Sequence, residues 1–245
     1  TICEDIWHKE PADAAARSGA ELLINLNASP FHRGKHKERW QVLSDRATEQ
    51  SIPMIYVNQV GGQDELVFDG GSFAVNADGE LAMVAPDFEE GSYELSVSRT
   101  VRGVEIAQGV AASALSDLAA VWQALVLGVR DYVEKNGFPG VVLGLSGGID
   151  SAVTLAVAVD ALGADRVHAV MMPFKYTADI SVADAGEQAS IMGVEYDVIS
   201  IEPIYEMFMS GLLAFLNSTS LDAMLNLASD SLEQRTRARF ERGTP

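Results

Sequence analysis

The run from Gly144 to Ser151 has the residue types of an anion-binding turn. It reads Gly-Leu-Ser-Gly-Gly-Ile-Asp-Ser and separates an apolar, strand-like stretch (141–143) from an apolar, helix-like stretch (152–162). Such a turn directs backbone N–H groups and the positive end of a helix at one point, where an anion binds well. The common P-loop ends in Gly-Lys-Ser/Thr, whereas here the lysine is absent and Asp150 precedes Ser151. The sequence therefore predicts an anion site of a different type.

These residues resemble the pyrophosphate loop of the ATP pyrophosphatases, whose signature is Ser-Gly-Gly-x-Asp-Ser. All five fixed positions are present between Ser146 and Ser151. In enzymes with this loop a substrate attacks the α-phosphate of ATP and is adenylylated, and a nucleophile, often ammonia, then displaces AMP. The resemblance implies an ATP site formed by Gly144, Leu145, Ser146, Gly147, Gly148, Ile149, Asp150 and Ser151.

Asp150 can be interpreted in two ways. Its carboxylate would repel phosphate directly, but Mg²⁺ prefers carboxylate and phosphate oxygens together. Aspartate is also a favoured N-cap of a helix, and a helix is expected to begin here. Within this motif we favour Asp150 as a ligand of Mg²⁺.

Cys3 is the only cysteine and lies in Ile-Cys-Glu-Asp-Ile-Trp. A single cysteine is more often a small buried hydrophobic residue than a nucleophile. The acidic neighbours Glu4 and Asp5 also disfavour a thiolate, so a catalytic role would need a base and a cation from elsewhere. Taken alone, Cys3 is best interpreted as structural.

The wider sequence reverses that interpretation, because it resembles the family of glutamine-dependent NAD⁺ synthetases, with a nitrilase-type glutaminase domain. The segments that carry the resemblance in the first half are 3–7, 27–31, 34–35, 56–64 and 68–70. Those in the second half are 124–132, 144–151, 172–173 and 176–177. A Cys-Glu-Asp segment and a pyrophosphate loop in one chain form a specific pair, because other members of each superfamily carry only one.

The resemblance implies roles for several residues. Cys3 would attack the side-chain amide of glutamine, and the backbone N–H of Glu4 would help to hold the oxyanion. Ser29 and Lys35 would bind the amino-acid end of glutamine. Ser231 stands where the family has an Asn near the dinucleotide, so it is a candidate contact for deamido-NAD⁺. The substrates would be glutamine, ATP and deamido-NAD⁺, with Mg²⁺ as cofactor.

Both ends of the sequence bear on these roles. The chain begins at Thr1 and ends in a polar stretch, so we interpret it as a fragment of a longer protein. The glutaminase triad also needs a Glu and a Lys, which in the family precede the cysteine by many residues. We therefore expect the chain as given to be inactive as a glutaminase. Two alternatives stay open: another ATP-dependent glutamine amidotransferase, or a catalytically inactive nucleotide-binding fragment.

Composition narrows the choice of partners. The chain has 245 residues, of which 48% are hydrophobic, and a formal net charge of −18. Such a charge repels nucleic acid and anionic membranes, so we expect neither as a partner. No apolar run reaches the length of a membrane span, and no signal peptide is evident, which favours a cytoplasmic protein. A homo-oligomer is implied by the family resemblance.

Hydrophobic periodicity predicts the elements that position these residues. In the first part we expect strands at 21–27 and 52–60, a helix at 37–50, and short strands at 66–68 and 72–76. In the second part strands at 140–145, 166–172 and 195–201 alternate with helices at 151–162, 181–192 and 203–216, after a long helix at 116–135. This alternation predicts a parallel sheet with helices on both faces.

The expected fold is therefore α/β with two domains. Residues 1–108 would form the C-terminal part of a nitrilase-like α-β-β-α glutaminase domain. Residues 114–245 would begin a Rossmann-like ATP-pyrophosphatase (adenine nucleotide alpha hydrolase-like) domain. The weakly patterned segment 93–108 is interpreted as the link between them.

Overall fold

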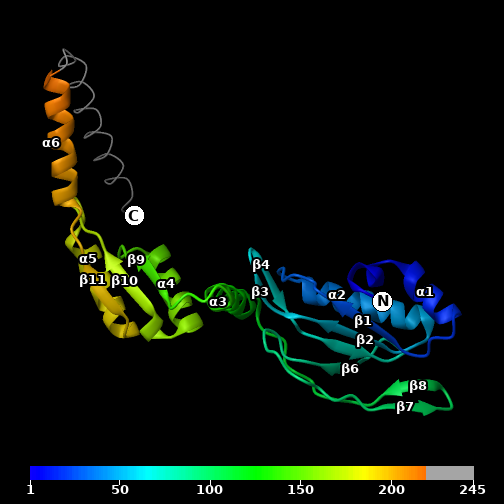
Figure 1. The fold of residues 1–245 in the computed structure, drawn as a ribbon. Helices are drawn as coiled ribbons and strands as arrows, with labels where there is room; N and C mark the ends of the chain where they lie inside the picture. The colour runs from blue at the N-terminus through cyan, green and yellow to red at the C-terminus, as the bar shows by residue number, and fades with distance from the viewer. Residues whose placement is uncertain (219–245) are drawn as a thin grey trace.

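The structure is a computed structural model that describes residues 1–218, and it consists of two lobes joined by one long helix (Figure 1). The first lobe contains a four-stranded sheet in the order β1-β2-β5-β6. β1 and β2 are parallel, and the other two pairs are antiparallel. The strands are β1 (Leu23–Asn27), β2 (Met54–Asn58), β5 (Phe73–Val75) and β6 (Leu81–Val84).

Two helices, α1 (Lys9–Arg17) and α2 (Lys35–Gln50), pack against one face of this sheet. The apolar side of α2 supplies Leu43 and Ala47 to a core that also contains Met54, Tyr56 and Phe73. A short 3₁₀ helix (Cys3–Trp7) precedes α1 and contributes Ile6 to the same core. α1 is not among the helices expected from hydrophobic periodicity.

β1 differs from the expected buried strand. Its apolar residues Ile24 and Leu26 are 48% and 54% exposed, whereas Asn25 and Asn27 are buried. The asparagines are tolerated inside because they bond to each other: Asn25 Nδ2 donates to Asn27 Oδ1 at 2.8 Å, and Asn27 Nδ2 donates to the Val57 carbonyl at 3.2 Å. The polar side of this strand therefore faces α2.

Two hairpins extend from the first lobe. β3 (Val60–Gln63) pairs with β4 (Leu66–Asp69), and β7 (Val97–Thr100) pairs with β8 (Gly103–Ile106). The second hairpin corrects the interpretation of 93–108 as a link between domains. Ile106 is 3% exposed and packs with Ala82 and Met83, so this segment is part of the first lobe.

The second lobe has a parallel three-stranded sheet in the order β11-β10-β9. Its elements match the expected alternation closely. In chain order they are α3 (Asp117–Lys135), β9 (Val141–Gly144), α4 (Ile149–Leu162), a 3₁₀ turn (Ala164–Arg166), β10 (Val167–Met171), α5 (Asp179–Met192), β11 (Glu195–Val198) and α6 (Glu202–Ser218).

Helices on both faces of this sheet were expected, but within residues 1–218 they lie on one. The strand positions Val167, Ala169 and Met171 are buried in one core with residues of α4 and α5. His168 and Val170 point to the other face and are only partly buried. The reason is topological: successive right-handed crossovers that move in one direction along a sheet place their helices on the same side.

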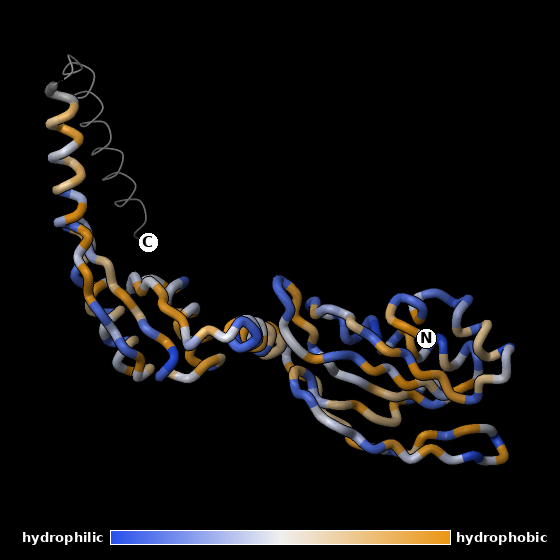
Figure 2. Tube along the Cα trace, viewed as in Figure 1, coloured by the Kyte–Doolittle hydropathy of each residue, from blue (hydrophilic) through white to orange (hydrophobic). Residues whose placement is uncertain are grey.

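α6 extends away from the sheet (Figure 1) and carries long apolar stretches (Figure 2). Near its start, the ring of Tyr205 packs on that of Phe174 with centroids 4.9 Å apart. Ile204, Met207 and Phe208 are exposed. No helix within residues 1–218 combines the length and apolarity needed to cross a bilayer.

Candidate functional site

The loop after β9 has the shape expected of a phosphate site. Leu145 is buried, and its N–H donates to the Val170 carbonyl at 2.9 Å, which anchors the loop to the sheet. Gly147 has φ +76°, and a Cβ at this position would lie 2.2 Å from the carbonyl oxygen of Ser181 in α5. Only glycine fits there, because both the backbone conformation and the close approach exclude a side chain.

Two serines close the loop across its mouth. Ser146 Oγ lies 3.0 Å from Ser151 Oγ, and Ser151 Oγ donates to the Gly148 carbonyl at 2.9 Å. The Gly148 N–H in turn donates to Ser146 Oγ at 3.3 Å. Both hydroxyls are therefore held at the start of α4, where an incoming phosphate oxygen could bond to them.

The N-terminus of α4 has no side-chain cap. Its N-cap is Gly148, so the interpretation of Asp150 as the N-cap is wrong. Asp150 is the second residue of the helix and is exposed beside the loop. The first-turn N–H groups of a helix have no partner within the helix, and here they face the loop.

The Asp150 carboxylate fits a Mg²⁺ ion that is held jointly by the protein and a nucleotide. Mg²⁺ commonly binds through one or two carboxylates together with substrate phosphates and water. Among residues 1–218 there is no group of three or more His, Cys, Asp or Glu side chains that could hold a metal alone. The exposed Asp150 carboxylate beside the phosphate loop could supply the single protein ligand that Mg²⁺ needs when it is bound to a nucleotide. The assignment of Asp150 as a ligand stays a prediction.

Cys3 lies at a sharp turn from extended chain into a helix. Ile2 bridges Leu26 in parallel beside β1, and Cys3 then begins the 3₁₀ helix with φ +45°. A positive φ is strained for a residue with a side chain, and such strain is concentrated at functional sites. Asn25 Nδ2 holds the turn by donating to the Cys3 carbonyl at 3.3 Å. Glu4 is the second residue of this helix, where backbone N–H groups lack helical partners.

Lys35 reaches the same 3₁₀ helix from the start of α2. Its Nζ lies 4.1 Å from the centre of the Trp7 ring and 3.1 Å from Glu38 Oε2. The Lys35 side chain is 28% exposed, so the ammonium is held between an aromatic face and a carboxylate but remains accessible.

Ser29 is held in a buried polar framework. Its N–H donates to Asn58 Oδ1 at 2.9 Å, and its Oγ accepts from Arg39 Nε at 3.2 Å. Arg39 also donates to the carbonyls of Ser29 and Pro30 at 2.9 and 3.0 Å. Its guanidinium is completed by Asp69, whose two carboxylate oxygens lie 2.9 and 2.8 Å from Nη1.

Asn25 connects the Cys3 turn with the strand that precedes Ser29. Its Nδ2 donates to the Cys3 carbonyl at 3.3 Å and to Asn27 Oδ1 at 2.8 Å. Lys35 contacts Trp7, the last residue of the helix that Cys3 begins. Tyr56 is buried in the same lobe, and burial raises the pKa of its phenol. The roles of Cys3, Glu4, Ser29 and Lys35 in one glutamine site stay predictions.

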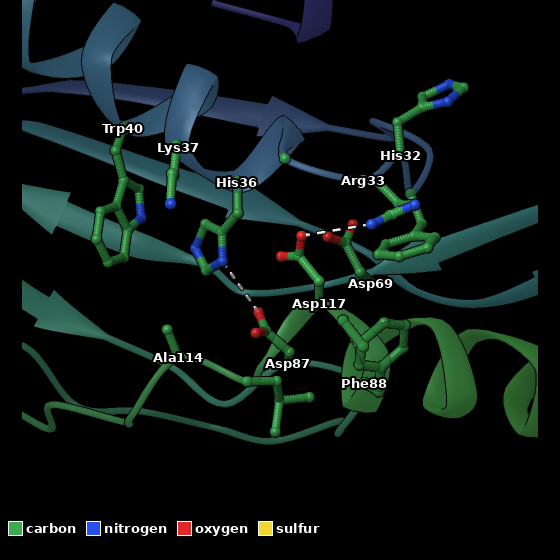
Figure 3. Close-up of a pocket in the computed structure, with 14 residues that line it drawn as sticks. His32, Arg33, His36, Lys37, Trp40, Asp69, Asp87, Phe88, Ala114 and Asp117 are labelled. Carbon is green, nitrogen blue, oxygen red and sulfur yellow. Dashed lines mark ion pairs between the residues drawn. The ribbon is translucent and has the colours of Figure 1, made fainter.

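A separate pocket lies where α2 approaches the start of α3 (Figure 3). Its cavity volume is about 110 Å³. His36 Nδ1 lies 3.5 Å from Asp87 Oδ1 across it, and Arg33 lies 3.7 Å from Asp117. Burial lowers the pKa of His36, with Asp87 opposing, and burial raises the pKa of Asp87, with His36 opposing. No pattern in the sequence predicted this pair.

Comparison with known proteins assigns the two lobes. The chain matches the carbon-nitrogen hydrolase family over residues 1–110 and the NAD synthase family over residues 121–241. It is 46% identical over 238 residues to a glutamine-dependent NAD(+) synthetase of Acinetobacter baylyi, with 96% of this chain and 42% of that protein covered. It is 45% identical to one from Xylella fastidiosa, with 96% and 43% covered. The chain belongs to the glutamine-dependent NAD(+) synthetase family.

A solved structure in this family agrees with the fold. The glutamine-dependent NAD+ synthetase of Acinetobacter baumannii in complex with ADP has 48% identity and a TM-score of 0.83, covering 91% of this chain and 42% of that one. A homologue from Cytophaga hutchinsonii, at 19% identity and a TM-score of 0.68, shares the fold. The expected α/β fold class and family are thereby confirmed. The chain spans about 42% of the length of the curated relatives cited above.

Sequence reasoning assigned no role to three residues of this NAD(+) synthetase family member. Arg39, Asn58 and Asp69 form the framework around Ser29, although Asn58 and Asp69 lie in segments that carried the resemblance. Arg39 could have been found as a charged residue one turn before Leu43 on the side of α2 that also buries Arg46 and Ala47. Ser231, the candidate contact for deamido-NAD⁺, lies outside the described residues.

Proposed function

We propose that the protein that carries this chain is a glutamine-hydrolysing NAD⁺ synthase. It would convert deamido-NAD⁺ to NAD⁺ with ammonia from glutamine, and convert ATP to AMP and pyrophosphate. The observation that carries the proposal is the presence of two sites in one chain. Cys3 lies at a strained turn in the first lobe. In the second lobe a Ser-Gly-Gly-Ile-Asp-Ser loop leads into a helix, α4, whose N-terminus has no side-chain cap.

In the first lobe Cys3 would act as the nucleophile. Its sulfur forms a bond to the side-chain carbonyl carbon of glutamine while the C–N bond breaks, and the nitrogen leaves as ammonia after taking a proton. Water then hydrolyses the thioester to glutamate and regenerates the thiol. The Glu4 N–H would stabilise the oxyanion, and the Lys35 ammonium would bind the α-carboxylate of glutamine. Ser29, fixed by Arg39 and Asn58, would position the amino-acid end of the substrate.

In the second lobe the loop after β9 would bind the β- and γ-phosphates of ATP. The carboxylate of deamido-NAD⁺ attacks the α-phosphorus, the α–β phosphoanhydride bond breaks and pyrophosphate leaves. Ammonia then attacks the acyl carbon, the bond to AMP breaks and one proton is released. The first-turn N–H groups of α4 and the hydroxyls of Ser146 and Ser151 would hold the leaving pyrophosphate. Mg²⁺ bound through Asp150 would neutralise part of its charge.

Proximity supports the roles in the first lobe. Asn25 Nδ2 donates to the Cys3 carbonyl at 3.3 Å and to Asn27 Oδ1 at 2.8 Å, two residues before Ser29. Lys35 contacts Trp7, at the other end of the helix that Cys3 begins. We also propose that the full-length protein is a homo-oligomer, which light scattering would test. We propose that it is cytoplasmic, which cell fractionation would test.

The test of the proposal is a product balance. The full-length protein would be incubated with glutamine, ATP, Mg²⁺ and deamido-NAD⁺, and NAD⁺, AMP, pyrophosphate and glutamate would be quantified. We expect NAD⁺, AMP and pyrophosphate in equal amounts, and no ADP. Formation of ADP and phosphate would contradict adenylylation. Amidation of a different carboxylate in a substrate panel, with deamido-NAD⁺ unused, would favour another ATP-dependent amidotransferase.

A further inference from the structure

A helix of the second lobe holds a peptide group of the first. Asp131 Oδ2, on α3, accepts a hydrogen bond of 2.7 Å from the Gly62 N–H in β3. Lys135 Nζ, one turn further along α3, donates to the Gly62 carbonyl at 2.7 Å. Asp131 and Lys135 are themselves 2.9 Å apart. Both polar groups of one residue in the hairpin are thus bound by a charged pair on α3. We call Asp131, Lys135 and Gly62 the interlobe clamp.

The contact at the clamp is tighter than an ordinary side-chain contact. A Cβ at Gly62 would lie 3.1 Å from Asp131 Cβ and 3.3 Å from Gly128 Cα. A Cβ at Gly61 would lie 3.1 Å from Asp131 Oδ2, and Gly61 has φ +141°. The hairpin backbone therefore packs directly on the helix, as Figure 1 shows for β3 and α3. Such a contact transmits a displacement of α3 to the hairpin.

The hairpin continues directly into the framework that holds Ser29. Val60 of β3 pairs with Asp69 of β4, the carboxylate that binds Arg39. Between Asn58 and the hairpin, the Gln59 N–H donates to the Asn27 carbonyl at 3.1 Å, and the Gln59 carbonyl accepts from Gly70 N–H at 3.0 Å. The base of the hairpin and the candidate glutamine site therefore share one set of backbone and side-chain bonds.

The opposite side of α3 packs against α4. Trp122 Nε1 donates to Asp160 Oδ2 at 2.8 Å, and Val126 and Val133 are buried in one core with Leu155 of α4. α4 begins at the phosphate loop. One helix therefore contacts both the element that follows the nucleotide loop and the hairpin that leads to Ser29.

We propose that Asp131 and Lys135 are positioning residues for glutamine hydrolysis, which act from the second lobe by fixing the β3–β4 hairpin through Gly62. This inference rests on the proposed function. Loss of the clamp should loosen Asn58 and Asp69, and through them Ser29, without touching the nucleotide site. The expected signature is a defect in glutamine use and unimpaired use of free ammonia.

The test uses the full-length protein with the substitutions Asp131→Ala, Asp131→Asn and Lys135→Met. Asp131→Ala removes the acceptor of the Gly62 N–H, so kcat/KM for glutamine should fall about tenfold, as expected for loss of a hydrogen bond to a charged group. Asp131→Asn keeps an acceptor oxygen and should restore most of the activity. Lys135 is 54% exposed, so Lys135→Met should fold normally and lower kcat/KM by a smaller factor. NAD⁺ synthesis from ammonium chloride should stay within about twofold of wild type in all three, because neither Asp131 nor Lys135 lies in the phosphate loop or in α4.

Glu134→Gln is the matched control. Glu134 lies on the same helix but is 3.6 Å from Arg166, within the second lobe, so its loss should leave glutamine use unchanged. Unchanged kcat/KM for glutamine in Lys135→Met, together with either unchanged activity or unfolding of Asp131→Ala, would overturn the inference. Equal losses with glutamine and with ammonia would also overturn it. A wild-type protein that makes NAD⁺ from neither nitrogen source would refute the proposed function itself and the inference with it.

Discussion

Arg39 Nη1 donates to both carboxylate oxygens of Asp69, and this ion pair lies in the interior of the first lobe, with side chains 0% and 5% exposed. Arg39 also donates to Ser29 Oγ and to the carbonyls of Ser29 and Pro30. A buried pair with all its donors used is costly to break on one side, because the remaining charge has no partner. It therefore fixes the loop that carries Ser29.

Arg39→Met should destabilise the protein by about 3–5 kcal/mol, since it leaves the Asp69 carboxylate buried and unpaired. Urea unfolding followed by circular dichroism would measure the loss. The control is Arg17→Met: Arg17 lies on α1 in an exposed pair with Asp13, whose loss should cost less than about 1 kcal/mol. Similar, small effects of the two substitutions would show that the buried pair does not hold the loop.

The His36–Asp87 pair should make stability depend on pH. The folded pKa of His36 is lowered from 6.5, so the unfolded chain binds a proton more readily as pH falls through that value. Stability should therefore decrease on acidification from neutral pH through 6.5. Thermal melting across this range should show a smaller decrease in His36→Leu than in wild type. A larger decrease in the variant would contradict the direction of the shift.

Asp87 works in the opposite direction at lower pH. Burial raises its folded pKa from 3.8, so the folded state binds a proton more readily than the unfolded chain does. The stability that this carboxyl contributes is therefore lost as pH rises above 3.8. Between pH 3.8 and pH 6.5, the dependence of wild-type stability on pH should reflect both groups. Thermal melting of Asp87→Asn should lack the acidic part of the curve. Because Asp87 opposes the lowering of the His36 pKa, the variant should also lose at least as much stability as wild type on acidification through pH 6.5, and a smaller loss there would contradict the coupling.

Gly147→Ala should strongly weaken nucleotide binding. The new Cβ would meet the Ser181 carbonyl oxygen at 2.2 Å, and φ is +76°, so the loop or the start of α5 must move. Titration calorimetry with ATP and Mg²⁺ should show a loss of at least about tenfold in affinity, the equivalent of 1.4 kcal/mol. Gly186→Ala, also a glycine beside this sheet, has its nearest neighbour at 3.8 Å and should bind normally. Normal binding by Gly147→Ala would refute the close-contact argument.

Asp150→Asn should separate metal binding from folding. Asp150 is exposed and does not cap α4, so the free energy of unfolding without ligand should stay within about 1 kcal/mol of wild type. The stabilisation by ATP should lose its dependence on Mg²⁺, because a neutral amide is a poorer ligand for this ion than a carboxylate. The same Mg²⁺ dependence in variant and wild type would remove Asp150 from the metal site.

The sequence predicted local features well wherever one strong pattern determined them. The strand-loop-helix unit around 144–151 is defined by glycines, an apolar strand and an apolar helix, and the structure places β9 and α4 there. The alternation that follows was equally clear. Cys3 was predicted as functional only through the resemblance, because its strained φ of +45° leaves no mark in the residue types around it.

Features that depend on tertiary contacts were missed. In β1 the polar side chains of Asn25 and Asn27 are buried, which is the opposite of what their hydropathy predicts. Their hydrogen bonds to each other and to a neighbouring strand explain this burial. Placement of α4 and α5 on one face follows from strand order, which periodicity does not reveal. The 93–108 segment lacks a clear pattern because only Ile106 of β8 is buried.

The most direct test of the proposed function compares two nitrogen sources in full-length wild type and Cys3→Ala. We expect Cys3→Ala to make no NAD⁺ from glutamine but to retain synthesis from ammonium chloride at a rate within about twofold of wild type, because the nucleophile is removed while the nucleotide site in the other lobe is untouched. NAD⁺ synthesis from glutamine by Cys3→Ala at the wild-type rate would refute the role of Cys3, and an equal loss with both nitrogen sources would refute the division between two sites.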